Sequence, residues 1–81
     1  MDYLERRLEA LEKLRAAEPT NMEYRARIGE VQEMIDDNAT LADVEERLKV
    51  LKLFGNQHAD DRLLWSRIGE LTEAAEALLE E

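Results

Sequence analysis

The segment Arg-Ile-Gly-Glu stands at residues 27–30 and again, unchanged, at residues 67–70. A shift of 40 residues aligns the two halves of the chain without a gap and makes nine positions identical, where random pairing would give about four. Apolar positions correspond as well, for example Val31 with Leu71. We therefore expect one helical domain, residues 1–81, that contains an internal repeat of residues 1–40 and 41–81.

Apolar residues in each half recur at intervals of three and four, which is the period of an amphipathic helix. The pattern is interrupted only near residues 19–21, 37–40 and 55–57. The sequence therefore predicts an all-α chain of four antiparallel helices, arranged as two duplicated helical hairpins. A four-helix bundle, a short stacked repeat and a dimer that shares hairpins between chains all fit this pattern. The predicted core residues are Leu4, Leu8, Leu11, Leu14, Tyr24, Ile28, Val31, Ile35, Leu41, Val44, Leu48, Leu51, Leu64, Ile68, Leu71, Ala75 and Leu78.

The predicted helix starts carry capping residues. Three pairs have the spacing of a capping box or of its aspartate variant, in which side chains accept hydrogen bonds from the free backbone N–H groups of the first turn. We expect the fourth helix to begin near Asp60 or Asp61, and Gly55 to end the third helix in the left-handed conformation. The three pairs are Asp2 with Glu5, Thr20 with Glu23, and Thr40 with Asp43.

Two glycines, Gly29 and Gly69, stand at the same repeat position inside predicted helices. Because glycine there costs about 1 kcal/mol relative to alanine, we expect both to lie at close helix crossings. The junctions from Pro19 to Gly29 and from Ala59 to Gly69 have the spacing of tetratricopeptide repeats, and Trp65 adds an aromatic residue where that family often has one. At these two junctions the chain resembles tetratricopeptide-like helical hairpin repeats, and the resemblance implies helix pairs that stack side by side.

The charge balance excludes several classes of partner. Eleven Lys and Arg residues against twenty Asp and Glu residues give a formal net charge of -9. Nucleic acids and anionic membranes attract proteins with a basic patch, so we expect neither as a partner. No apolar run approaches the length of about 18 residues that a membrane span needs, and the first residues lack the pattern of a signal peptide. Since the chain also has no cysteine, we expect a cytoplasmic protein without disulfides.

The sequence predicts no enzyme, cofactor or metal site. A helical di-metal site needs two Glu-x-x-His motifs, and the chain has one histidine, His58. The single serine, Ser66, has no sequence context that would pair it with a base and an orienting third group. The three glycines stand alone, so no phosphate-binding loop is expected. Arg27 and Arg67 could clamp an anion, but an ion pair of each with the glutamate three residues later accounts for them.

The second half of the chain has four apolar residues in addition to those that one core-facing side of its helices can account for. At three positions beside the apolar stripe, a charged residue of the first half corresponds to an apolar residue of the second. These residues, together with Phe54, either close the core of the chain itself or form a surface for self-association or a partner, with the tryptophan as its anchor. The three pairs are Lys13 and Leu53, Glu23 and Leu63, and Arg25 and Trp65.

We therefore expect a non-enzymatic helical module for protein–protein interaction or scaffolding. The apolar surplus predicts self-association, most simply as a homodimer. One alternative is an acidic inhibitor or immunity-type protein that binds a basic partner. Another is an artificial helical protein without biochemical activity, although irregular choices such as Gln57-His58 differ from an idealised design.

Overall fold

The computed structural model describes residues 2–80 of the chain. Within this range helices are the only regular secondary structure, which confirms the prediction of an all-α chain. The helices are α1 (Tyr3–Ala17), α2 (Met22–Asp36), α3 (Leu41–Gln57) and α4 (Arg62–Glu80). None of these four helices combines the length and the apolar character that crossing a bilayer requires.

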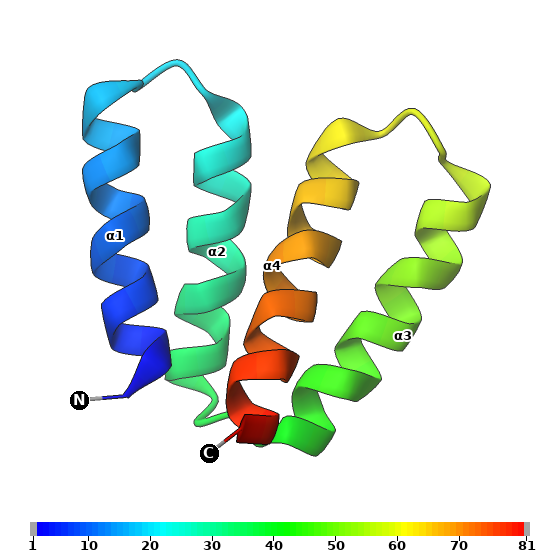
Figure 1. Cartoon of the computed structure of the whole chain (residues 1–81). Helices are drawn as coiled ribbons and strands as arrows, with labels where there is room; N and C mark the ends of the chain where they lie inside the picture. The colour runs from blue at the N-terminus through cyan, green and yellow to red at the C-terminus, as the bar shows by residue number, and fades with distance from the viewer. Residues whose placement is uncertain (1, 81) are drawn as a thin grey trace.

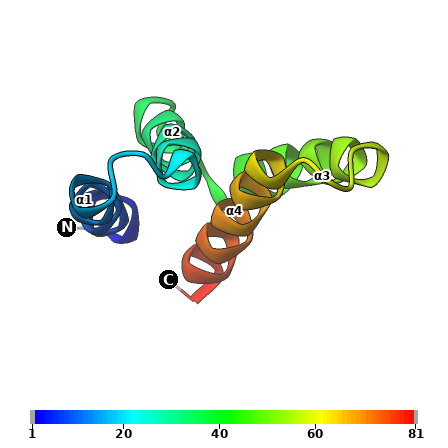
Figure 2. The same ribbon diagram turned by 90° about the horizontal axis from the view of Figure 1, so that it is seen from above.

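The helices lie side by side in the order α1, α2, α4, α3. The α1–α2 and α3–α4 connections lie at one end of the molecule, and the α2–α3 connection lies at the other (Figure 1). Seen from above, α1 and α3 form the two outer edges (Figure 2), whereas α4 packs against all three other helices. The resulting molecule is flattened, with principal extents of 36 × 32 × 19 Å.

The core is built from corresponding positions of the two halves. Most of the predicted stripe residues lie in this core or pack against it. Leu14 is an exception, because it lies in the last turn of an outer helix and stays 42% exposed. The sequence pattern also missed Met34 and Ala74, which are buried one turn after Val31 and Leu71. Six pairs of buried residues are separated by 40 positions: Leu4 and Val44, Leu11 and Leu51, Ala26 and Ser66, Glu30 and Glu70, Val31 and Leu71, and Met34 and Ala74.

The helix starts agree with the predicted caps at three of four places. Asp2 accepts a hydrogen bond from the Glu5 amide, and the start of α3 is a complete capping box. At α4, Asp61 accepts from the Leu64 amide. The prediction of Thr20 as the cap of α2 is wrong, because the helix starts one residue later and the side chain of Asn21 accepts from the Glu23 amide.

Gly55 does not end the third helix. It is buried inside α3, which continues to Gln57 and is capped by His58. Among residues 2–80 a positive φ occurs only at Asn38, with a value of 51°. This residue turns the chain between α2 and α3, and the amide of the next residue, Ala39, donates back to the carbonyl of Met34.

Candidate functional site

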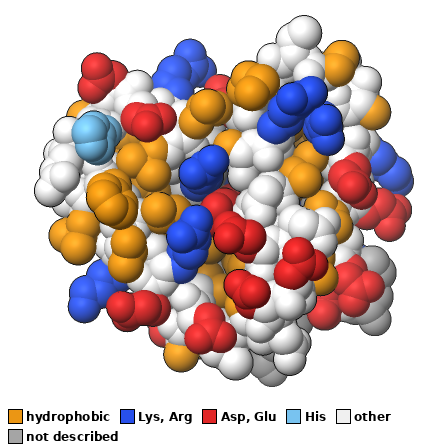
Figure 3. Space-filling model, turned by 180° about the vertical axis from the view of Figure 1, so that it is seen from behind, with side chains coloured by type: hydrophobic (Ala, Val, Ile, Leu, Met, Phe, Trp, Pro, Cys, Tyr) orange, Lys and Arg blue, Asp and Glu red, His pale blue; other side chains and the backbone are white. Residues whose placement is uncertain are grey.

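Large apolar side chains are exposed on the second helix pair, α3 and α4. We call five of them the α3–α4 apolar residues: Val50 (41% exposed), Leu53 (60%), Phe54 (51%), Leu63 (38%) and Trp65 (39%). The four residues singled out from the sequence belong to this set. Viewed from behind, the molecule shows hydrophobic side chains gathered over the part formed by α3 and α4 (Figure 3).

The tryptophan of this set is fixed against α3. Its indole ring lies over Gly55, where an added Cβ would come within 2.9 Å of the ring and 3.0 Å of the Ile68 Cδ1 atom. The indole N–H donates to the carbonyl of Ala59 at 3.1 Å. One side of Trp65 therefore closes the contact between α3 and α4, while the residue stays 39% exposed.

The duplicated glycines are not the close crossings that the sequence predicted. An added Cβ at Gly29 would meet nothing within 4 Å, and the residue is exposed, so this prediction is wrong. At Gly69 the three nearest atoms all belong to the Arg27 guanidinium, the closest at 3.0 Å. The end of an arginine side chain therefore lies there instead of a helix backbone. The close crossing belongs to Gly55, whose counterpart in the first half is Arg15.

A buried carboxylate joins three helices. Glu70 of α4 is fully buried and accepts two hydrogen bonds from Arg7 of α1, at 2.8 and 2.9 Å. Arg27 of α2 donates a third at 3.1 Å and also pairs with Glu73 at 3.2 Å. The expected ion pair between Arg27 and Glu30 on the same helix is therefore wrong. The hydrogen bond to Glu70 is the main cause that raises the pKa of Arg7.

The same contact recurs 40 residues later with the halves exchanged. Arg47 of α3 donates two hydrogen bonds to the buried Glu30 of α2, at 3.0 and 3.1 Å, and lies 3.6 Å from Glu33. The hydrogen bond to Glu30 raises the pKa of Arg47. Each half thus supplies an arginine to a buried glutamate of the other half.

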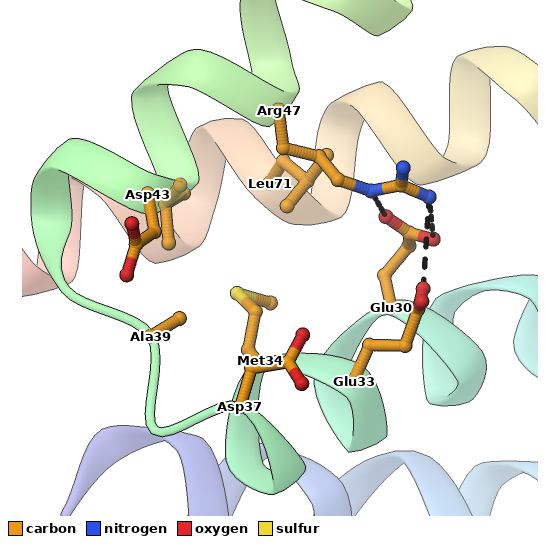
Figure 4. Close-up of a pocket in the computed structure, with 9 residues that line it drawn as sticks. Glu30, Glu33, Met34, Asp37, Ala39, Asp43, Arg47 and Leu71 are labelled. Carbon is orange, nitrogen blue, oxygen red and sulfur yellow. Dashed lines mark hydrogen bonds and ion pairs between the residues drawn. The ribbon is translucent and has the colours of Figure 1, made fainter.

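A pocket of about 310 Å³ opens beside this second contact, between α2 and α3. Its apolar part comes from Met34, Ala39, Val44 and Leu71, and the pair of Arg47 with Glu30 and Glu33 forms one side (Figure 4). The carboxylates of Asp37 and Asp43 complete the lining. The sequence analysis did not identify this pocket, because its residues lie on three helices and a connection that only the fold brings together.

Among the polar side chains of residues 2–80, two arrangements would indicate a reactive site: metal-binding groups and buried atoms without a hydrogen-bond partner. Within residues 2–80, no group of three or more His, Cys, Asp or Glu side chains is placed to hold a metal ion. In the same range every buried side-chain nitrogen and oxygen has a hydrogen-bond partner. His58 is an exposed cap at the end of α3, and Ser66 donates to Glu23 at 2.7 Å. The buried polar groups therefore act in structural contacts.

Comparison with protein families, with curated proteins and with solved structures finds no match to this chain.

Proposed function

We propose that this protein is a non-enzymatic helical interaction or scaffold module that self-associates through its α3–α4 apolar residues. The observation that supports this proposal is the exposure of large apolar side chains at positions where the first half carries charges. Leu53 replaces Lys13 and is 60% exposed, and Leu63 replaces Glu23 and is 38% exposed. Exposed apolar surface costs about 25 cal/mol per Å² relative to burial, so association that covers these residues is favourable.

The position of α3 favours a second copy of the chain as the partner. This helix lies at an outer edge and packs chiefly on α4 (Figure 2). Its outward side is therefore available, and Val50, Leu53 and Phe54 are spaced by three and four residues as on one side of a helix. Contact between two such sides would bury the same residues from both chains, which is how symmetric dimers form.

We further propose that the two helix pairs are duplicated antiparallel hairpins that pack together within one chain. The ends of α1 and α3 support this, because Glu18 and His58 have nearly the same backbone torsions, φ -134° with ψ 70° and 62°. The amides of Asn21 and Asp61 then donate to the carbonyls of these two residues at the same distance, 3.0 Å. The exchanged Arg–Glu pairs support packing of the hairpins within a chain, since each pair joins one half to the other.

The test of self-association replaces Leu53 by Lys and Leu63 by Glu together. The first substitution restores the residue type at position 13 and the second the type at position 23, while Trp65 is kept because it supports α3. We expect light scattering after size exclusion to give a dimer for the parent chain and a monomer for the variant, with helical content unchanged. A charge-matched control, Met22→Lys with Leu79→Glu, changes exposed residues outside the set and should remain dimeric. A parent that is monomeric at every concentration would refute the proposal.

The formal net charge of -9 supports one other candidate, an acidic protein that blocks a basic surface. The dependence of binding on ionic strength distinguishes the two candidate functions. Binding between an acidic surface and a basic partner weakens as ionic strength rises, whereas apolar self-association does not. Sedimentation of the parent chain at low and high salt therefore tests whether its contacts are apolar.

A further inference from the structure

The pocket between α2 and α3 has a counterpart in the other half of the molecule, where a tyrosine stands at the position of Asp43. The 40-residue shift that relates Arg47 to Arg7 and Glu30 to Glu70 also relates Asp43 to Tyr3. Tyr3 packs against the hydrophobic core. Burial and the Glu70 carboxylate raise the pKa of its hydroxyl group.

Asp43 lines the pocket at the position that corresponds to Tyr3. Its side chain is shorter than that of tyrosine and accepts a hydrogen bond from the Thr40 amide, as part of the cap of α3. The pocket of about 310 Å³ lies beside Met34, Val44 and Leu71, and Figure 4 shows Met34, Leu71 and the ion pair around it. This volume is at the lower end of the range of about 300 to 1,000 Å³ that is usual for small-molecule sites.

The two places also differ in charge. Beside Tyr3, two guanidinium groups, Arg7 and Arg27, face two carboxylates, Glu70 and Glu73. In the pocket Arg47 is the only cation of the lining, which also contains four carboxylates. The counterpart of Arg27 is Arg67, which is exposed and forms no ion pair within residues 2–80.

Relative to its counterpart, the pocket thus lacks one aromatic ring and one positive charge and carries two more carboxylates, Asp37 and Asp43. We propose that it binds a small aromatic cation, an aryl ring that carries an ammonium group. The ring lies on Met34, Val44 and Leu71, where apolar burial and the methionine sulfur favour it. The ammonium group lies toward Glu33, Asp37 and Asp43, the carboxylates that no second arginine neutralises. This site is separate from the α3–α4 apolar residues and does not depend on self-association.

Tyramine is the probe that tests this proposal, because it joins a phenol ring to an ammonium group. In a titration followed by nuclear magnetic resonance, we expect saturable shifts of the Val44 and Leu71 methyl signals. 4-Hydroxyphenylacetate has the same ring with a carboxylate in place of the ammonium group, and we expect it to bind at least about tenfold more weakly. Equal binding of the two compounds, or no saturation by tyramine up to about 10 mM, would overturn the proposal.

Two substitutions locate the bound molecule. Asp43→Tyr copies the residue of the first half into the pocket and should reduce tyramine affinity at least about tenfold by filling it. Because Asp43 also caps α3, Glu33→Gln provides a second measurement that leaves the cap intact, and it should weaken binding about threefold or more. Glu73→Gln is the matched control at the equivalent position outside the pocket and should leave binding unchanged. Equal effects of Glu33→Gln and Glu73→Gln would show that only overall charge matters and would refute the site.

The two proposals can fail separately. The Leu53→Lys and Leu63→Glu variant should bind tyramine as the parent does, since neither residue lines the pocket. Loss of self-association with tyramine binding intact therefore supports both assignments, whereas loss of both functions in this variant would contradict the separation of the two sites.

Discussion

Arg7 donates two hydrogen bonds to the fully buried carboxylate of Glu70, from the opposite half of the chain. A buried carboxylate is tolerated only when hydrogen bonds and an opposite charge replace its water shell. Here the contact joins α1 to α4, the two helices that contact each other least among the packed pairs. The ion pair therefore supplies a specific link where the apolar contact is small.

Removal of Arg7 should destabilise the protein strongly. Breaking a buried pair by deleting one partner costs about 3 to 5 kcal/mol, and the remaining hydrogen bond from Arg27 lowers our expectation for Arg7→Met to about 2 to 4 kcal/mol. Urea unfolding measures this free energy. The control is Arg67→Met at an exposed residue, for which we expect a change within about 0.5 kcal/mol. Similar losses in the two variants would show that general charge, not the Glu70 contact, is responsible.

Alanine at Gly55 should lower the melting temperature even though alanine favours the helix. The new methyl group would lie 2.9 Å from the indole of Trp65, and a ring packed against a helix cannot move aside freely. Overpacking of this kind costs about 1 to 3 kcal/mol, which exceeds the propensity gain of about 1 kcal/mol. A higher melting temperature for Gly55→Ala would contradict the described contact.

Alanine at Gly29 should have the opposite effect. This glycine is exposed within α2 and has no atom within 4 Å of an added Cβ. The helix propensity of alanine is then uncompensated, so we expect Gly29→Ala to stabilise the protein by about 0.5 to 1 kcal/mol. The same thermal melts that test Gly55 give this value, and destabilisation here would indicate a partner helix on that side of α2.

The hydroxyl group of Tyr3 predicts a pH dependence at high pH. Burial first, and then the Glu70 carboxylate, raise its pKa above the ordinary value of 10.0. The folded state therefore holds this proton more tightly than the unfolded state, and stability falls as the pH rises above about 10. Tyr3→Phe removes the effect, so the difference in unfolding free energy between parent and variant should be constant from pH 6 to 9 and change above pH 10. A difference that does not vary with pH would place the hydroxyl group in water.

The cap of α3 gives a prediction with a direct internal control. Thr40 accepts from the Asp43 amide and donates its own amide to the Asp43 carboxylate, so Thr40→Ala should cost about 1 kcal/mol. Thr20 has the same sequence spacing to an acidic residue, but Asn21 makes the cap of α2. Thr20→Ala should therefore change the free energy of unfolding by less than about 0.3 kcal/mol. Equal effects would indicate that sequence spacing, not the observed cap, decides stability.

The sequence predicted the helices and most of the core because both depend on local periodicity. Apolar residues at intervals of three and four must share one side of a helix, so residues such as Leu11 and Val31 could be placed in the core. Capping also depends on neighbours in the chain, and two of the predicted helix ends were wrong: Asn21 and not Thr20 caps the start of α2, and α3 continues past Gly55.

The partners of the charged residues could not be predicted in this way. A long arginine side chain reaches residues of its own helix and of neighbouring helices equally well, and the arrangement of the helices decides between them. Arg27 thus pairs with Glu70 and Glu73 across the helix contact instead of with Glu30. The role of Gly55 depended on where Trp65 lies, and the pocket depended on how close α2 comes to the start of α3. The alignment of the two halves pairs Tyr3 with Asp43. Only the structure shows that Asp43 lines a pocket.

The exchanged arginine contacts are reciprocal, as the contacts of an isologous interface are. Each half gives one guanidinium group, Arg7 or Arg47, and one buried carboxylate, Glu30 or Glu70, and receives the complementary group from the other. An isologous contact is closed, because both units use the same surface, whereas a head-to-tail contact leaves a free surface at each end for further growth. A third unit of 40 residues would find both arginines and both glutamates already engaged. An array built on this contact is therefore complete with two units.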